Sequence, residues 1–247
     1  MARAPDSLIA RTWRGIGAAR LFLIDARHRS AWWTRLSAGD ALHQDSTLTW
    51  PDRYPRLFGE AQRLLGAGGA HRLLSFGCSS GEEVLSLARY FPYAELVGAE
   101  INRAQLRACR ALPADPRISF IHSSPARIAA AGPYDAIFCM AVFQRRPHEI
   151  ERRGRTDIGR LYPFARFDAE IAALVAQLRP GGLLIVDHSL FLVEHSTAAA
   201  WLEPVAGVGT APAKGPRFDP AGALIAPAPV IDRVFRKTGP GADGDTR

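Results

Sequence analysis

A turn bounded by two glycines constrains this chain more than any other feature of its sequence. Residues 72–76 are apolar enough for a buried strand, and the turn at residues 77–81 follows directly. A helix-forming segment comes next, and a second apolar run then ends in Glu100. Glycines let the backbone approach a ligand closely, and the free N–H groups of a helix start can donate to it. The stretch predicts a nucleotide-binding strand–helix–strand unit with Glu100 on a ribose.

The turn argues against two common nucleotide sites. A dinucleotide site favours Gly-x-Gly-x-x-Gly, and here Ser79 stands where the middle glycine makes room for a pyrophosphate. Glu82 and Glu83 open the helix and would repel a diphosphate. A P-loop is excluded because no Gly-Lys-Ser or Gly-Lys-Thr follows the turn. We therefore expect a ligand that carries an ammonium group.

This stretch resembles motif I and the acidic loop of class I S-adenosylmethionine-dependent methyltransferases. The form Gly-Cys-Ser-Ser-Gly-Glu-Glu at residues 77–83 is similar to that of the chemotaxis-receptor glutamate methyltransferases. The resemblance covers roughly residues 70–190. It implies a Rossmann-like α/β fold, with a mostly parallel seven-stranded sheet flanked by helices and an N-terminal helical extension.

The resemblance also implies S-adenosylmethionine as the cofactor, with its methionine part on the first loop. By matching position, Glu82 takes the amino group and Glu100 the ribose. Many family members carry an aspartate for the adenine after the third strand, where this chain has His-Ser-Ser-Pro at residues 122–125. The implied cofactor-binding residues are Phe76, Gly77, Cys78, Ser79, Ser80, Gly81, Glu82, Glu100, Ile101, Asn102, Ser123, Ser124, Met140 and Ala141.

The order of later segments supports the same fold. Apolar runs at residues 117–122 and 134–140 predict two further strands of a sheet buried on both faces. Residues 178–188 predict a helix end, a turn and a fifth strand, with Pro180 and two glycines ending the helix. The run at residues 230–237 predicts an edge strand, the final antiparallel strand of the sheet.

The chain divides into three predicted parts. Residues 1–69 form an N-terminal helical extension, with helices at 7–33 and 55–65. The stretch 47–55 is either a lid on the cofactor or an irregular connector. Residues 70–238 form the methyltransferase domain, in which 204–229 is a loop, and 239–247 form a disordered tail.

Catalytic groups are expected at the carboxyl ends of the fourth and fifth strands. Methyl transfer needs alignment, and a general base only for an acceptor that must lose a proton. His188 is the candidate base and Gln144 the candidate orienting group, while a structural role is open for each. Arg145 and Arg146 either hold an acidic acceptor or belong to a solvated face.

The composition adds limits on partners and compartment. The net charge of +7 comes almost wholly from dispersed arginines, so nucleic acid is not a favoured partner. Three cysteines form no disulfide framework, and no apolar run reaches the length of a membrane span. We expect a cytoplasmic protein without a metal, and the sequence leaves its oligomeric state open.

These observations predict a methyltransferase that acts on a small molecule or a protein side chain, with an acidic acceptor as one alternative. A non-catalytic S-adenosylmethionine-binding module for regulation or assembly is a second interpretation, since no catalytic constellation stands out. An RNA methyltransferase is a third. Enzymes that methylate the amino group of a base carry a characteristic motif after the fourth strand. This chain has Met-Ala-Val-Phe there, at residues 140–143, which argues against methyl transfer to a base amino group.

Overall fold

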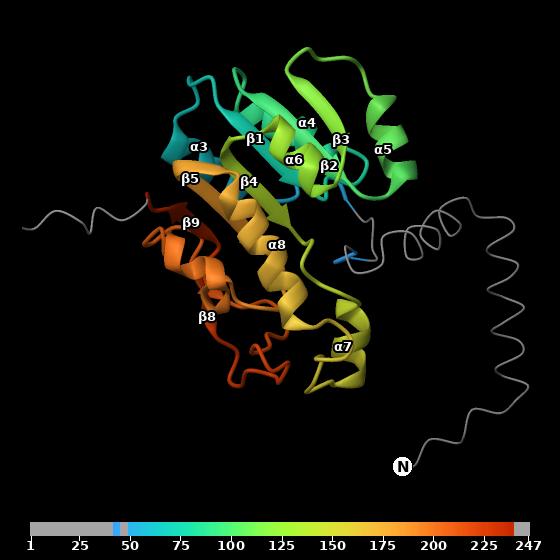
Figure 1. The fold of residues 1–247 in the computed structure, drawn as a ribbon, viewed down its shortest axis with the longest axis vertical. Helices are drawn as coiled ribbons and strands as arrows, with labels where there is room; N and C mark the ends of the chain where they lie inside the picture. The colour runs from blue at the N-terminus through green and yellow to red at the C-terminus, as the bar shows by residue number, and fades with distance from the viewer. Residues whose placement is uncertain (1–41, 45–48, 240–247) are drawn as a thin grey trace, which may run out of the picture.

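A seven-stranded sheet forms the centre of the computed structural model, which describes residues 42–44 and 49–239 (Figure 1). The five strands β1 to β5 are parallel, and β9 runs antiparallel to both of its neighbours. This confirms the predicted α/β fold with a mostly parallel sheet. In spatial order the strands are β3 (Ile118–His122), β2 (Glu95–Glu100), β1 (Arg72–Phe76), β4 (Tyr134–Met140), β5 (Leu178–Asp187), β9 (Val234–Lys237) and β6 (Leu202–Pro204).

Helices cover both faces of the sheet, because alternate residues of each strand point to opposite sides. In β4, Phe138 joins the apolar cluster of one face and Ile137 that of the other. Helices α3 (Pro55–Leu65), α4 (Glu82–Tyr90) and α5 (Arg103–Arg110) cover the first face. Helices α6 (Pro125–Ala131) and α8 (Phe164–Ala176) cover the second, and α7 (Pro147–Arg153) lies beyond the carboxyl end of β4 (Figure 1).

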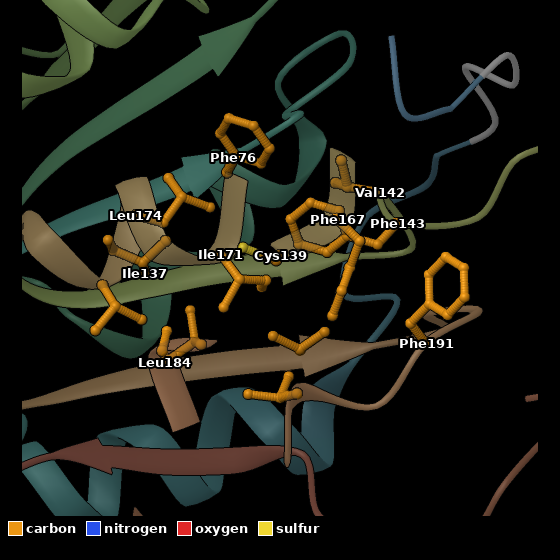
Figure 2. Close-up of a cluster of buried hydrophobic side chains, with 14 of the residues drawn as sticks. Phe76, Ile137, Cys139, Val142, Phe143, Phe167, Ile171, Leu174, Leu184 and Phe191 are labelled. Carbon is orange, nitrogen blue, oxygen red and sulfur yellow. The ribbon is translucent and has the colours of Figure 1, made fainter. Parts of the chain in front are cut away.

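Helix α8 shows how the sequence makes this packing. Phe167, Ile171 and Leu174 repeat at helical spacing and are all buried. They lie against Ile137 and Leu184 of the sheet (Figure 2). Burying each such side chain contributes roughly 1.5–3 kcal/mol, so this stripe is a principal source of the stability of the second face.

The sequence predicts a turn between α8 and the fifth strand, but the residues of that turn belong to the strand itself. The helix ends at Ala176, and residues 178–182 already belong to β5. Strand pairing passes from Tyr134 opposite Leu178 to Ala136 opposite Leu183, so the longer strand bulges between them. Gly181 takes a positive φ of 78° in this bulge, a conformation that glycine adopts without strain.

The final antiparallel strand predicted at residues 230–237 is confirmed as β9, but its predicted extent and its position at the edge are wrong. The run is divided into β8 (Val230–Ile231), which pairs with β7 (Ala211–Pro212), and β9. β9 lies inside the sheet, between β5 and β6, where Val234 is buried on one face and Phe235 on the other. The strand at this edge of the sheet is β6. It has three residues, too few to show the alternating pattern by which a strand is predicted from sequence.

The N-terminal part is described only from residue 42 onwards. The helix expected at 55–65 is α3, with Leu57, Phe58 and Ala61 buried. The helix expected at 7–33 and the tail at 240–247 lie outside the described residues, as do residues 45–48 of the region expected to hold a lid. Two short 3-10 helices, Val193–His195 and Thr197–Trp201, lead into β6. No helix in the described residues is long and apolar enough to cross a membrane.

Candidate functional site

The turn after β1 is held close to the neighbouring strands. The N–H groups of Gly77 and Cys78 both donate to the carbonyl of Ala99 at the end of β2, at 2.8 and 3.1 Å. Gly77 has a φ of +76°, and a Cβ there would lie 2.7 Å from Val142 Cγ2. Only glycine fits this position, so the turn keeps its backbone against the exit of β4.

Glu100 lies at the end of β2 and ties two loops together. Its carboxylate accepts from Ser79 N at 2.8 Å and from Asn102 N at 2.6 Å. Burial raises the pKa of Glu100, while the N–H groups of Asn102, Ser79 and Ile101 oppose that shift. Each carboxylate oxygen has more than one acceptor site, so these bonds leave capacity for the hydroxyls of a ribose.

The two glutamates that begin α4 differ in their surroundings. Glu82 accepts from Ser80 Oγ at 2.9 Å, whereas Glu83 accepts from Ser75 Oγ of β1 at 2.8 Å. Glu83 also lines a cleft beside Gly77. Burial raises the pKa of Glu83 to about 8, against the opposing effects of the Ser75 hydrogen bond and Arg53. The structure therefore brings Glu83 to the cleft, whereas the family resemblance implies Glu82 as the residue that takes the amino group. The polar Ser75 in an otherwise apolar strand was the available signal.

A segment before α3 lies across this cleft. The guanidinium carbon of Arg53 lies 4.3 Å from the centre of the Trp50 ring and 5.1 Å from that of Tyr54. All three side chains line the cleft with Gly77 and Glu83, and the remaining cavity is about 30 Å³. This is the space of roughly one water molecule. The donors and acceptors fit an ammonium-bearing nucleotide, but the nucleotide needs residues 50–54 to withdraw.

Of the residues expected to contact the adenine and the methyl group, Met140 lines this cleft, and Ser123 and Ser124 lie at the exit of β3. Ser123 N donates to the carbonyl of Glu100 at 3.0 Å, which keeps the exits of β2 and β3 together. Ser124 is at the N-cap of α6 and makes no side-chain capping bond. Met140 is buried and lines the cleft. Phe76 stacks on Phe143 in the core, so only its backbone faces the turn.

Three further expected residues have mainly structural contacts. Asn102 caps α5, since its side chain accepts from Ala104 N at 2.9 Å. Ile101 is half-buried between the ends of β2 and α5. Ala141 is buried after β4, with a φ of +58°, and its N–H donates to Asp187 O at 2.9 Å. These contacts fix the backbone around the cleft.

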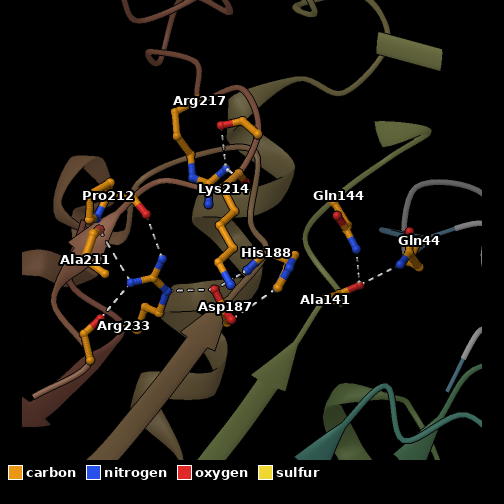
Figure 3. Close-up of polar contacts among 12 residues, drawn as sticks. Gln44, Ala141, Gln144, Asp187, His188, Ala211, Pro212, Lys214, Arg217 and Arg233 are labelled. Atoms are coloured by element: carbon orange, nitrogen blue, oxygen red, sulfur yellow. Dashed lines mark hydrogen bonds and ion pairs between the residues drawn. The ribbon is translucent and has the colours of Figure 1, made fainter. Parts of the chain in front are cut away.

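An acidic group orients the candidate base. His188 Nδ1 lies 3.1 Å from Asp187 Oδ2, within ion-pair distance, although the two atoms do not form a hydrogen bond. Asp187 Oδ1 accepts from Arg233 Nε at 2.8 Å and from His188 N at 2.9 Å (Figure 3). Burial alone would raise the pKa of Asp187, but His188 and Arg233 outweigh it and hold the pKa well below its usual range. His188 has a φ of +53°, uncommon for a residue other than glycine.

Gln144 is held by the backbone. Its Nε2 donates to Ala141 O at 3.2 Å, and Gln44 Nε2 donates to the same oxygen at 2.6 Å (Figure 3). Arg145 is turned toward the N-terminal segment, where Nη1 donates to Leu42 O at 2.8 Å. These bonds join residues 42–44 to the exit of β4. They favour a positioning role for Gln144.

A second, larger cavity opens beside His188. It has a volume of about 680 Å³ and lies between α7 and residues 214–217. His188 and Gln144 both line it, so the structure brings the two candidate catalytic residues together. Arg53 lines both this cavity and the smaller cleft, which therefore share a wall. Among the described residues, no group of three His, Cys, Asp or Glu side chains could hold a metal ion.

Comparison with known sequences identifies one part of the chain. A family model described as "Methyltransferase domain" matches residues 73–156, from β1 to just beyond α7. The ubiquinone/menaquinone biosynthesis C-methyltransferase UbiE of Syntrophotalea carbinolica is 38% identical over 66 residues. That match covers 26% of this chain and 28% of the relative, so the chain spans less than a third of the relative it matches.

Solved structures give only distant likenesses. TrmN from Thermus thermophilus is 16% identical, with 83% of this chain and 53% of that chain covered and a TM-score of 0.44. The plantazolicin methyltransferase BpumL in complex with SAH is 13% identical, with 68% and 55% covered and a TM-score of 0.39. Neither likeness carries an argument about the activity of this chain.

Proposed function

We propose that this chain, whose residues 73–156 are part of an S-adenosylmethionine-dependent methyltransferase domain, transfers a methyl group to an acceptor bound beside His188. The observation that carries the proposal is the pair of spaces that share Arg53 as a wall. One contains the turn at Gly77 and the carboxylate of Glu83, and the other contains His188. A donor and an acceptor bound in these spaces would face each other at the carboxyl edge of the sheet.

The cofactor assignment follows from the chemistry of the groups present. The sulfonium of bound S-adenosylmethionine supplies an electrophilic methyl group. Glu83 would hold its ammonium group, the backbone at Gly77 would lie against its methionine part, and Glu100 would accept from its ribose hydroxyls. The likeness of residues 77–83 to the chemotaxis-receptor enzymes supports a motif glutamate on the ammonium group, and we propose no receptor substrate.

His188 would act on the acceptor. Its Nδ1 lies next to Asp187, so a proton on that nitrogen would face the carboxylate and leave Nε2 as the base. Nε2 would take the proton from an acceptor hydroxyl or amine as its oxygen or nitrogen bonds to the methyl carbon, while the bond from that carbon to sulfur breaks and S-adenosylhomocysteine leaves. Alignment of donor and acceptor in a dry site supplies up to about 7–11 kcal/mol of the reduction in barrier. The acceptor class is a small molecule or a protein side chain.

Glu100→Ala is expected to weaken S-adenosylmethionine binding at least ten-fold. A hydrogen bond to a charged group contributes about 1.5–3 kcal/mol, and the carboxylate also keeps Ser79 and Asn102 in place. Calorimetric titration measures the change. Glu95→Ala on the exposed start of the same strand is the matched control, since Glu95 pairs with Arg72 outside the site. Equal affinities in the two variants would remove Glu100 from the site.

Cofactor binding at pH 7 is expected to release close to one proton. The pKa of Glu83 is about 8 in the free protein, so its carboxyl is mostly neutral at pH 7. An ammonium group favours the charged carboxylate, which lowers that pKa and drives the proton off. Affinity should therefore rise as the pH rises from 6 to 8. Calorimetry in two buffers of different ionisation enthalpy counts the protons, and Glu83→Gln should abolish the release.

Turnover with labelled S-adenosylmethionine tests the activity itself. The purified chain is incubated with a metabolite extract, with peptides and with RNA, and S-adenosylhomocysteine is measured in each. Label on a small molecule or a peptide supports the proposal, whereas label on RNA would replace the acceptor class. Tight cofactor binding without turnover on any acceptor would favour a regulatory or assembly module.

A further inference from the structure

The larger cavity beside His188 is lined mainly by cationic side chains. Arg53, Arg146, Arg152, Lys214 and Arg217 face it, against the carboxylates of two glutamates on α7. Such walls select the charge of a ligand as well as its shape.

The two glutamates do not cancel this charge. Glu149 is engaged by three arginines, with Arg146 Nη1 at 3.6 Å, Arg153 Nη1 at 3.3 Å and Arg155 Nη2 at 3.8 Å. Glu151 is exposed on α7. Arg152 and Lys214 make no ion pair within the described residues. The cavity therefore keeps an excess of positive charge.

Arg217 is the most unusual of these residues because it is charged, buried and only partly bonded. It is 3% exposed, and its Nη1 donates to three carbonyls, those of Lys214, Gly215 and Pro216, at 3.0 to 3.4 Å. Nε and Nη2 have no partner among the described residues, and no carboxylate there lies within ion-pair distance of the guanidinium. A buried charge is costly unless it is paired.

The surroundings of Arg217 increase this cost. Burial lowers the pKa of Arg217 to about 10, the charge of Asp187 opposes this shift, and Arg233 adds to it. Asp187 is already bonded to Arg233 and faces His188, so it does not neutralise Arg217. An anion in the cavity would supply the missing partner.

The position of Arg217 is fixed by its neighbours in the fold. Phe218 is fully buried, and its N–H donates to Leu190 O at 2.9 Å, just beyond β5. Ile225 N donates to Arg217 O at 2.8 Å. Arg217 and Lys214 thus lie on the same side of the end of β5 as Asp187 and His188 (Figure 3). A group bound by Arg217 would hold the rest of its molecule next to His188.

We propose that Arg217, with Lys214 beside it, binds a carboxylate or phosphate group of a small-molecule methyl acceptor and thereby presents its reacting hydroxyl or amine to His188. A planar guanidinium with two donors to spare matches the two oxygens of such a group. This inference rests on the proposed methyltransferase function and names the class of its substrate.

Binding of small anions, measured without cofactor, tests the inference separately from the methyltransferase function. Benzoate and inorganic phosphate are titrated into the wild type, and benzamide serves as the neutral counterpart of benzoate. We expect one or both anions to bind and benzamide not to bind. Arg217→Gln should weaken anion binding at least ten-fold and change S-adenosylmethionine affinity less than about two-fold. Arg107→Gln on the exposed face of α5 removes the same charge elsewhere and should leave anion binding unchanged.

Lys214→Gln covers the case in which the buried Arg217 variant does not fold. Lys214 is exposed, so this variant should fold and weaken anion binding about three-fold or more. The preferred anion tells whether the acceptor carries a carboxylate or a phosphate. Equal binding of benzoate and benzamide, or unchanged anion affinity in the folded Arg217 or Lys214 variant, would overturn the inference. If the wild-type protein does not bind S-adenosylmethionine, the proposed function is overturned instead.

Discussion

Replacing His188 by asparagine is expected to lower kcat by about 10² to 10⁴, the usual contribution of a general base. Asparagine tolerates the positive φ of this position, so the variant removes the imidazole with little added backbone strain. Single-turnover methylation of the acceptor gives the rate.

Two comparisons separate this chemical role from a structural one. S-adenosylmethionine affinity should be nearly unchanged in His188→Asn, because His188 does not line the cleft at Gly77. His148→Asn removes an imidazole from the other wall of the same cavity, where it has no carboxylate partner among the described residues, and should change kcat less than about three-fold. A His188→Asn enzyme that retains the wild-type rate would show that alignment alone drives the reaction.

Replacing Arg233 by methionine is expected to destabilise the fold by about 3 kcal/mol or more. The change leaves the Asp187 carboxylate without its buried partner, and breaking such a pair costs about 3–5 kcal/mol. Arg233 Nη1 also donates to Gly209 O at 2.7 Å, which anchors the loop before β7. Urea unfolding, monitored by circular dichroism, gives the free energy of unfolding.

The dependence of this effect on pH identifies its cause. The pKa of Asp187 is depressed in the folded protein, so its pairing contributes stability above the ordinary carboxyl pKa and loses that contribution as the pH falls. The difference between the wild type and Arg233→Met should therefore shrink in acid. Arg236→Met, which removes a partly exposed arginine bonded to Gly181 O, should cost less than about 1 kcal/mol. A pH-independent loss would mean that Arg233 acts by packing.

The sheet was predictable because most of its strands are continuous apolar runs. The strand at 134–140 and the helix at 55–65 occur as the sequence predicts, since burial on both faces leaves a clear pattern. The C-terminal part was not predictable in the same way. β6 has three residues, and only its pairing with β9 makes it a strand. Such short elements depend on distant partners, which a local pattern does not contain.

The site shows the same division. The glycine turn and Glu100 follow from local chemistry, because a turn and a strand end are neighbours in the sequence of a strand–helix–strand unit. Glu83 instead reaches the cleft through its bond to Ser75, eight residues earlier. Arg217 approaches His188 because Phe218 pairs beside Phe191 at the end of β5. That arrangement joins a proline-rich stretch, which resembles an ordinary loop, to the strand after which His188 lies.

One calorimetric experiment tests the cofactor site most directly. The purified chain is titrated in parallel with S-adenosylmethionine, S-adenosylhomocysteine and NAD. We expect both sulfur nucleotides to bind and NAD not to bind, since the turn lacks room for a pyrophosphate and carries two glutamates. Binding of NAD, or of none of the three, would contradict the assignment of the cleft at Gly77 and Glu83, with Glu100 at the end of β2, to S-adenosylmethionine.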